Sequence, residues 1–169
     1  MKTEFLVTNE HLVIRPVQEG DAAFLFLVYA STRMDEMALV NWSDAQKAAF
    51  LRMQFDAQTI HYRSYYPQAE YQIIQREDGL PIGRVIIDRS NKFILLMDIA
   101  LLPEFRNSGI GTTLMCDLLA EAAASNRPVR LHVEVFNRAM KMYERLGFVK
   151  CNEQGIYHEM IWNPGGDHS

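Results

Sequence analysis

The stretch "LLPEFRNSGIGTTLM", residues 101–115, decides the fold, because an apolar run meets a helical pattern there. Arg106, Gly109 and Gly111 stand at the junction. The first amides of a helix have no partner inside it and carry partial positive charge, so such an end binds phosphate oxygens. Glycines permit close approach, and Arg106 adds a cation. The loop suits a pyrophosphate, and a plain tight turn is the alternative explanation.

Two well-known phosphate-binding motifs fit this loop poorly. No Gly-Lys-Ser/Thr follows the glycines, which excludes a Walker P-loop. A Rossmann loop needs a third glycine where Leu114 stands, although Glu134 lies at about the distance of its acidic residue. The antiparallel pattern before the loop argues further against a Rossmann fold.

The rest of the chain alternates between strand and helix patterns, in the order β-α-α-β-β-β-α-β-α-β-β. Only the step from residues 93–102 through a helix to residues 129–135 predicts a parallel crossover. Asp21 and Ser43 are expected N-caps, and Gly147 ends the last helix. The predicted strands are residues 11–15, 71–77, 81–89, 93–102, 129–135, 148–151 and 156–162. The predicted helices are residues 22–33, 44–59, a segment with Ile110, Leu114, Leu118 and Ala122 on one face, and 138–146.

Length and composition predict one domain over residues 1–169, with residues 163–169 as a frayed polar tail. The net charge of −4 argues against a nucleic-acid partner. No segment approaches the roughly 18 uninterrupted apolar residues of a membrane helix, so no membrane partner is expected. The start "MKTEFLVTNEHLVIRP" lacks a signal-peptide core. Cys116 and Cys151 form no metal spacing, which predicts reduced thiols, a cytoplasmic location and no metal.

Two motifs resemble the GNAT family of N-acetyltransferases. "RNSGIG", residues 106–111, matches its Arg/Gln-x-x-Gly-x-Gly/Ala signature. "NRAMKMYERLGF", residues 137–148, matches the Ala-x-x-x-Tyr-x-x-x-Gly-Phe part of its second motif, with Asn137 two residues before Ala139, and "VIRPVQEGDA", residues 13–22, is a weaker third match. The resemblance covers most of residues 11–162, firmly over 93–149 and thinly over 22–70.

This resemblance implies an α/β (α+β) fold. The expected architecture is a mixed, mainly antiparallel sheet of six to seven strands, flanked by about four helices. A V-shaped opening between the fourth and fifth predicted strands, 93–102 and 129–135, would receive acetyl-CoA. By resemblance, the backbone of Leu101 pairs with the pantetheine arm and Asn137 contacts the cofactor. The expected pyrophosphate contacts are Arg106, Asn107, Ser108, Gly109, Ile110, Gly111 and Thr112.

Tyr143 is the predicted proton donor to the departing thiolate, since a phenol has a pKa near 10. The alternative for Tyr143 is a packing aromatic with a satisfied hydroxyl. Asp98 is the first candidate for the general base, because a charge in an apolar strand is costly unless it is paired or functional. Glu134, which shares a strand face with His132, is the second candidate. Each of the two carboxylates has an ion-paired structural role as its alternative.

The acceptor site is expected from the N-terminal helices and the aromatic segment after them. These aromatics predict either a pocket or a packing seam; the candidates are Tyr29, Arg33, Trp42, His61, Tyr62, Tyr65 and Tyr66. The acidic balance favours an amine acceptor, either a small molecule or a peptide. The predicted function is direct acetyl transfer from acetyl-CoA to a primary amine in a ternary complex. A non-catalytic acyl-CoA-binding regulator and the use of another acyl-CoA are the alternatives, and a homodimer stays open.

Overall fold

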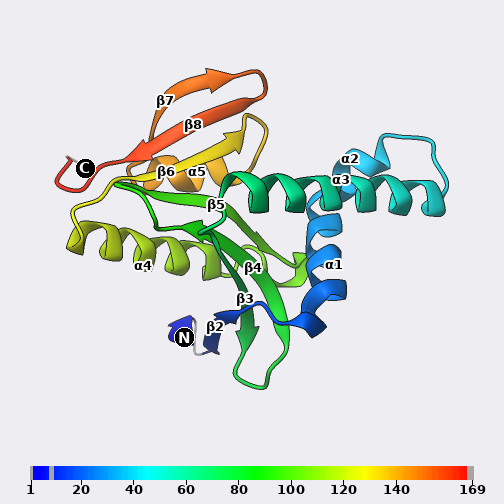
Figure 1. The fold of residues 1–169 in the computed structure, drawn as a ribbon, viewed down its shortest axis with the longest axis horizontal. Helices are drawn as coiled ribbons and strands as arrows, with labels where there is room; N and C mark the ends of the chain where they lie inside the picture. Colours follow the sequence, from blue (N-terminus) through cyan, green and yellow to red (C-terminus); the bar gives the residue numbers. More distant parts are fainter. Residues whose placement is uncertain (1, 8–9, 167–169) are drawn as a thin grey trace.

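The computed structural model describes residues 2–7 and 10–166. Within these ranges one sheet has eight strands in the order β1-β2-β3-β4-β5-β6-β8-β7, with five α-helices around it (Figure 1). The strands are β1 Thr3–Val7, β2 Glu10–Pro16, β3 Glu70–Arg76, β4 Pro81–Asp88, β5 Ile94–Leu101, β6 Val129–Glu134, β7 Val149–Gln154 and β8 Tyr157–Trp162. The helices are α1 Ala22–Thr32, α2 Met34–Ala38, α3 Asp44–Tyr65, α4 Ile110–Ala124 and α5 Ala139–Arg145.

The mixed, mainly antiparallel sheet predicted from the sequence is confirmed. Only β5 and β6 pair in parallel, and every other strand pair that the structure describes is antiparallel. β1 and α2 were not predicted. β1 extends the sheet by pairing with β2, from Thr3 opposite Ile14 to Val7 opposite Glu10. The outer part of the predicted frayed tail, residues 167–169, lies outside the described residues.

The helices cover the two faces of the sheet unequally. α4 and α5 bury the main core against one face, and the predicted apolar face of α4 is confirmed because Ile110, Leu114, Leu118 and Ala122 are all buried there. The helices α1, α2 and α3 form a smaller cluster around Tyr29, Met37 and Leu51. The opposite face of the sheet carries this second layer.

The predicted helix ends are partly confirmed. Ser43 caps α3, accepting a hydrogen bond from the Gln46 amide at 3.2 Å. α3 continues past residue 59 to Tyr65, so most of the aromatic segment is helical. Asp21 stands at the N-cap position of α1 but does not cap it. Its carboxylate accepts from both terminal nitrogens of Arg15, at 2.7 and 2.8 Å, and from the Gln18 amide at 2.7 Å.

The predicted opening lies between β5 and β6. These strands pair only from Ile94 opposite Val129 to Leu96 opposite Leu131, although both strands continue further. A bulge interrupts the β4–β5 ladder at the same level, where Ile86 faces Asp98 and Ile87 faces Leu96. Bulges bend a strand and end regular pairing. The second half of β5 therefore separates from β6, which confirms the V-shaped opening.

Candidate active site

The glycine loop, residues 106–111, turns the chain from the end of β5 into α4. Its backbone enters the left-handed region twice, at Asn107 with φ 57° and at Gly109 with φ 86°. The first hydrogen bond of α4 runs from the Thr113 amide to the Gly109 carbonyl, at 3.0 Å. Among the described residues, the amides of Ile110, Gly111 and Thr112 make no backbone hydrogen bond. Three N–H donors are thus left at the positive end of the helix dipole.

The two glycines of the loop, Gly109 and Gly111, differ in whether the backbone conformation requires a glycine. Gly109 needs its positive φ, which side-chain-bearing residues rarely adopt. Gly111 has helical backbone, and a Cβ built there would meet only the Met142 sulfur, at 3.9 Å. A helical glycine costs about 0.5–1 kcal/mol relative to alanine. Neither strain nor packing requires Gly111, and the space around its Cβ position is open within the described structure.

Arg106 ties the loop to the end of β5. Its Nε donates to the Leu101 carbonyl at 3.0 Å, and one terminal nitrogen lies 3.3 Å from both the carbonyl and the hydroxyl of Ser31 on α1. The side chain is exposed, and no carboxylate of the described residues pairs with it within 4.0 Å. Its charge is therefore available to an anion beside the open end of α4.

The backbone of Leu101 faces the opening. The Leu102 amide donates to Ile82 of β4 at 2.9 Å, and the next pair in the ladder is Gly83 with Leu101. Hydrogen-bonded and non-hydrogen-bonded pairs alternate in an antiparallel ladder. The Leu101 N–H therefore points away from β4, toward the side from which β6 has separated.

Asn137 and Thr112 lie at the two helix starts that approach each other. The Asn137 side-chain oxygen accepts from the Ala139 amide at 2.8 Å, so it caps α5. The Thr112 hydroxyl of α4 lies 3.5 Å from the Met142 sulfur of α5. Ser108 donates its hydroxyl to the Phe105 carbonyl at 2.7 Å, which stabilises the preceding turn. The predicted cofactor residues thus line one region between the end of β5, α4 and α5.

Tyr143 lies on α5, next to this region. The residue is buried, and its ring packs against Phe148 with 5.7 Å between centroids. Burial, and secondly the negative charge of Asp98, raise the pKa of the Tyr143 hydroxyl well above its ordinary value of 10.0. The phenol is therefore an O–H donor at neutral pH. The packing role and the predicted proton-donor role are compatible at this position.

Comparison with known proteins identifies the fold that carries these features. Residues 68–150 match the family model described as Acetyltransferase (GNAT) domain, which covers β3 to the start of β7. The chain contains a GNAT domain. Both motifs quoted above, residues 106–111 and 137–148, fall inside the matched range. Among curated proteins, none matches the sequence.

Solved structures share the whole GNAT fold at low identity. The PaiA N-acetyltransferase of Thermoplasma acidophilum, in complex with coenzyme A, is 18% identical with a TM-score of 0.68, over 90% of this chain and 98% of that one. An acetyltransferase of Thermus thermophilus is 16% identical with a TM-score of 0.64, over 95% and 99%. The spermidine N-acetyltransferase of Vibrio cholerae, in complex with CoA and spermine, is 21% identical with a TM-score of 0.60, over 90% and 95%.

The first base candidate in this GNAT domain, Asp98, is held by an arginine that sequence reasoning missed. Arg84 of β4 donates from Nε to the Asp98 carboxylate at 2.5 Å and from a terminal nitrogen to Gln58 of α3 at 3.0 Å. The Arg84 side chain is 7% exposed and that of Asp98 is 25% exposed. The sequence signal was a lone arginine in the otherwise apolar "PIGRVII", residues 81–87. Asp98 is therefore ion-paired, which was the alternative to a role as the base. Its negative charge also raises the pKa of Tyr143.

The second base candidate, Glu134, forms an ion pair at the far rim of the opening. Arg33, which follows α1, lies 3.0 Å from both Glu134 and Glu36. Burial, and then the charge of Glu134, raise the pKa of Tyr157, the neighbour of Glu134 on β8. His132, on the same face of β6, is exposed. The ion pair connects the end of α1 to the end of β6.

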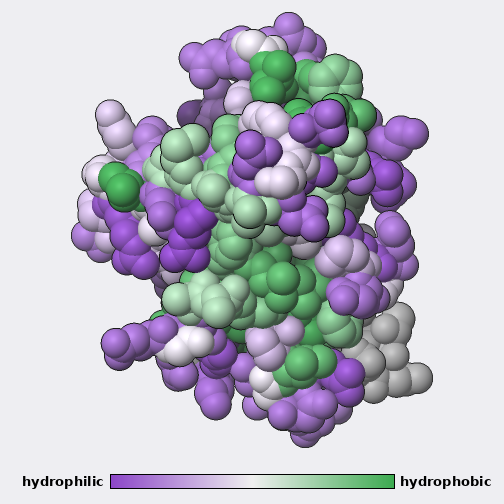
Figure 2. Space-filling model, turned by 90° about the vertical axis from the view of Figure 1, so that its right-hand side faces the viewer, coloured by the Kyte–Doolittle hydropathy of each residue, from purple (hydrophilic) through white to green (hydrophobic). Residues whose placement is uncertain are grey.

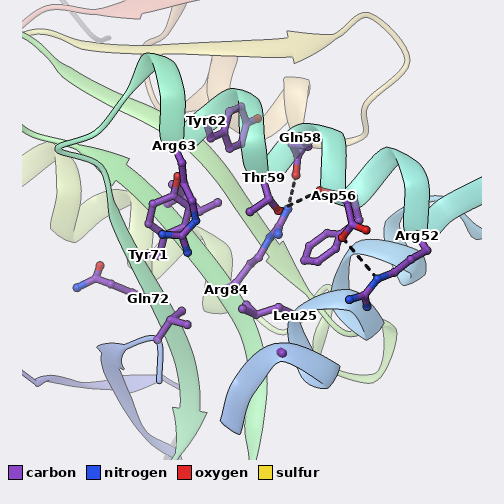
Figure 3. A pocket seen from close by; sticks show the side chains of 14 residues that line it. Leu25, Arg52, Asp56, Gln58, Thr59, Tyr62, Arg63, Tyr71, Gln72 and Arg84 are labelled. Atoms are coloured by element: carbon purple, nitrogen blue, oxygen red, sulfur yellow. Dashed lines mark hydrogen bonds and ion pairs between the residues drawn. The ribbon is translucent and has the colours of Figure 1, made fainter. Parts of the chain in front are cut away.

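A cavity of about 200 Å³ lies between α1, α3 and strands β3 and β4 (Figure 3). We call it the arginine pocket, after Arg52, Arg63 and Arg84 in its lining. Figure 3 shows Arg84 reaching toward Gln58, with Arg63 against Tyr71 on one side and Arg52 beside Asp56 on the other.

The predicted aromatic acceptor residues divide between pocket, seam and surface. Only Tyr62 lines the arginine pocket, and burial raises its pKa to about 12, with Asp98 as the next cause. Tyr29 is buried in the seam between α1 and α3 and packs on Phe55 at 5.4 Å. Trp42 and Tyr65 are exposed. Figure 2 shows apolar side chains gathered on the face where α1 and α2 lie; Leu27, Met34 and Leu39 are exposed residues of these segments.

In residues 2–7 and 10–166, no cluster of three or more His, Cys, Asp or Glu residues has the arrangement of a metal site. No helix of the described residues is both long and apolar enough to cross a membrane.

Proposed function

We propose that this GNAT domain transfers the acetyl group of acetyl-CoA to a primary amine by direct attack. The observation that best supports this proposal is the start of α4, where three backbone amides make no backbone hydrogen bond. Three backbone N–H groups and the Arg106 cation favour an anion, and Gly111 adds no side chain to this helix start. A helix N-terminus with free amides suits a pyrophosphate. The coenzyme A bound to the Thermoplasma relative supports the same assignment.

The chemistry follows from the groups around the opening. The amine nitrogen attacks the thioester carbonyl carbon, a C–N bond forms and the C–S bond breaks. The Leu101 amide, facing the opening, would stabilise negative charge on the carbonyl oxygen. Tyr143, protonated at neutral pH, would deliver a proton to the departing thiolate sulfur. The proton on the attacking nitrogen of the tetrahedral adduct would leave to Asp98, directly or through water, so that the product is a neutral amide, while Arg84 keeps that carboxylate in place.

An amine acceptor agrees with the relatives, since the Vibrio cholerae structure contains spermine. The test is free-thiol release from acetyl-CoA over a panel of amines. Thiol release that depends on an amine, with an acetylated product seen by mass spectrometry, would support the proposal. Tight binding of acetyl-CoA without turnover by any amine would instead identify a regulatory acyl-CoA binder. A propionyl-CoA arm of the same assay tests the identity of the acyl group.

A further inference from the structure

The arginine pocket and the base candidate Asp98 lie on one row across the sheet. Tyr71 of β3 faces Ile86 of β4, and Ile86 faces Asp98 of β5. Residues opposite each other in paired strands share a face of the sheet, and strands lie about 4.8 Å apart. The row from Tyr71 to Asp98 therefore spans two strand spacings, about 10 Å. Tyr71, Ile86 and Arg84 line the pocket, and Arg84 also holds Asp98.

The far end of this row offers an unpaired cation and an unpaired hydroxyl. Arg63 lies over the Tyr71 ring, 4.8 Å from its centroid, and no carboxylate of the described residues lies within ion-pair distance of it. The Tyr71 hydroxyl is buried without a hydrogen-bond partner in the described structure. Burial raises the pKa of Tyr71, so the hydroxyl stays a donor. A buried donor without a partner costs about 1–3 kcal/mol, and an acceptor group would recover it.

The other charges of the pocket are already matched. Arg52 pairs with Asp56 at 3.5 Å, and Arg84 pairs with Asp98 at 2.5 Å. The pocket thus keeps the charge of Arg63 as its excess, and this end attracts an anion and repels an ammonium group. Phe55, Leu25 and Ile86 make the space between the ends apolar.

We propose that the acceptor is an ω-amino carboxylate, a chain with an amine at one end and a carboxylate at the other. The carboxylate accepts hydrogen bonds from Arg63 and the Tyr71 hydroxyl, the apolar chain fills the arginine pocket, and the amine reaches Asp98. This inference rests on the proposed acetyl transfer and specifies its substrate class. It separates this chain from acetyltransferases of polyamines, whose second positive charge would meet Arg63.

The test compares acceptors of graded length and end group, using the full chain as the enzyme. The ω-amino acids of butanoate, hexanoate and octanoate are compared with their carboxamides and with the diamines of equal length, at saturating acetyl-CoA. We expect kcat/KM to rise from butanoate to octanoate, because the longer chains match the span of the row. Each long acid should exceed its carboxamide by about tenfold, the scale of one charge-assisted contact, and the diamines should be poorest. Equal rates for acids, amides and diamines would overturn the proposal.

Two variants assign the preference to residues. Arg63→Gln and Tyr71→Phe should each lower kcat/KM for the acid more than for the carboxamide, while the KM for acetyl-CoA stays unchanged. Arg76→Gln is the matched control, since Arg76 lies on the same strand as Tyr71, pairs with Asp78 and does not line the pocket. Equal losses for acid and carboxamide would show a merely structural role and would contradict the proposal.

The outcomes separate this inference from the proposed function. Turnover of other amines without a carboxylate preference leaves acetyl transfer standing and overturns the substrate class. If no amine leads to thiol release, calorimetric titration with ω-aminooctanoate tests whether the arginine pocket binds the carboxylate independently of catalysis. Binding to the wild type but not to Arg63→Gln would uphold a carboxylate site, and no binding to either would refute it.

Discussion

The substitution Gly111→Ala separates a glycine kept for the fold from a glycine kept for a ligand. The added Cβ has 3.9 Å to its only neighbour, the Met142 sulfur, which is ordinary van der Waals contact. Alanine is the better helix former by about 0.5–1 kcal/mol, and the first turn realises about half of that. For a domain of this size, the melting temperature should therefore rise by about 1–2 °C. Gly109→Ala places a side chain at φ 86° and should lower stability by about 1–2 kcal/mol.

Binding of acetyl-CoA should respond in the opposite direction to stability. The Gly111→Ala methyl group is added in the first turn of α4, where the open amides lie, so the charge-assisted contacts of a pyrophosphate there should weaken by about 1.5–3 kcal/mol, roughly 10- to 100-fold in Kd. Urea denaturation measures stability, and calorimetric titration with acetyl-CoA measures affinity. A Gly111→Ala variant that binds like the wild type would remove the ligand-based reason for this glycine. A loss of more than about 1 kcal/mol in stability would show that the packing argument is wrong.

The remaining predictions concern three side chains of the sheet and helices. Tyr143→Phe should lower kcat by a factor of about 10²–10⁴ at unchanged acetyl-CoA affinity. Because the pKa of Tyr143 is raised, ionisation of its phenol should not lower wild-type activity below about pH 10, and a pH–rate profile measures this. Arg84→Met leaves the Asp98 carboxylate without its partner and should cost about 3 kcal/mol in urea denaturation, and a loss near zero would contradict a stabilising pair. Arg15 lowers the pKa of Asp21 below its ordinary value of 3.8, so this pair stabilises the fold above that pH and its contribution is lost as pH falls further. The stability difference between wild type and Asp21→Asn should therefore be constant at neutral pH and shrink below about pH 4, and a pH-independent difference would refute the assignment.

Local signals predicted much of the fold and of the cofactor side. The apolar face of α4, the Ser43 cap and the Gly147 stop depend on residues within a turn or two of each other, and all three are confirmed. The parallel crossover followed from the length between two apolar strands. The roles of the glycine loop and of Tyr143 stay predictions, because chemistry at these groups is measured in solution.

Long-range pairing was beyond the sequence patterns. Asp98 and Glu134 were expected to be either functional or ion-paired, but their partners Arg84 and Arg33 depend on how distant segments meet. Arg84 reaches Asp98 diagonally, because Arg84 itself stands opposite Ala100 in the ladder. The aromatic segment was read as a pocket or a seam, and its divided roles follow from its helical continuation in α3. Alternate helix faces then point to different surroundings.

The bulge beside the opening also decides which side chains of β5 face the layer formed by α1, α2 and α3. Before it, Leu96 stands opposite Ile87 and shares the core of α4; after it, Asp98 stands opposite Ile86, which lines the arginine pocket. In a strand without a bulge, Asp98 would lie two residues after Leu96 and therefore on the same side, inside the apolar core; Met97, as the extra residue of the bulge, moves Asp98 to the other face. A deletion of Met97 would keep Asp98 opposite Ile86, but it would remove the bulge that bends β5 away from β6. In sequences related to this one, a gap at position 97 would therefore signal a narrower opening between β5 and β6, even where every motif residue is kept.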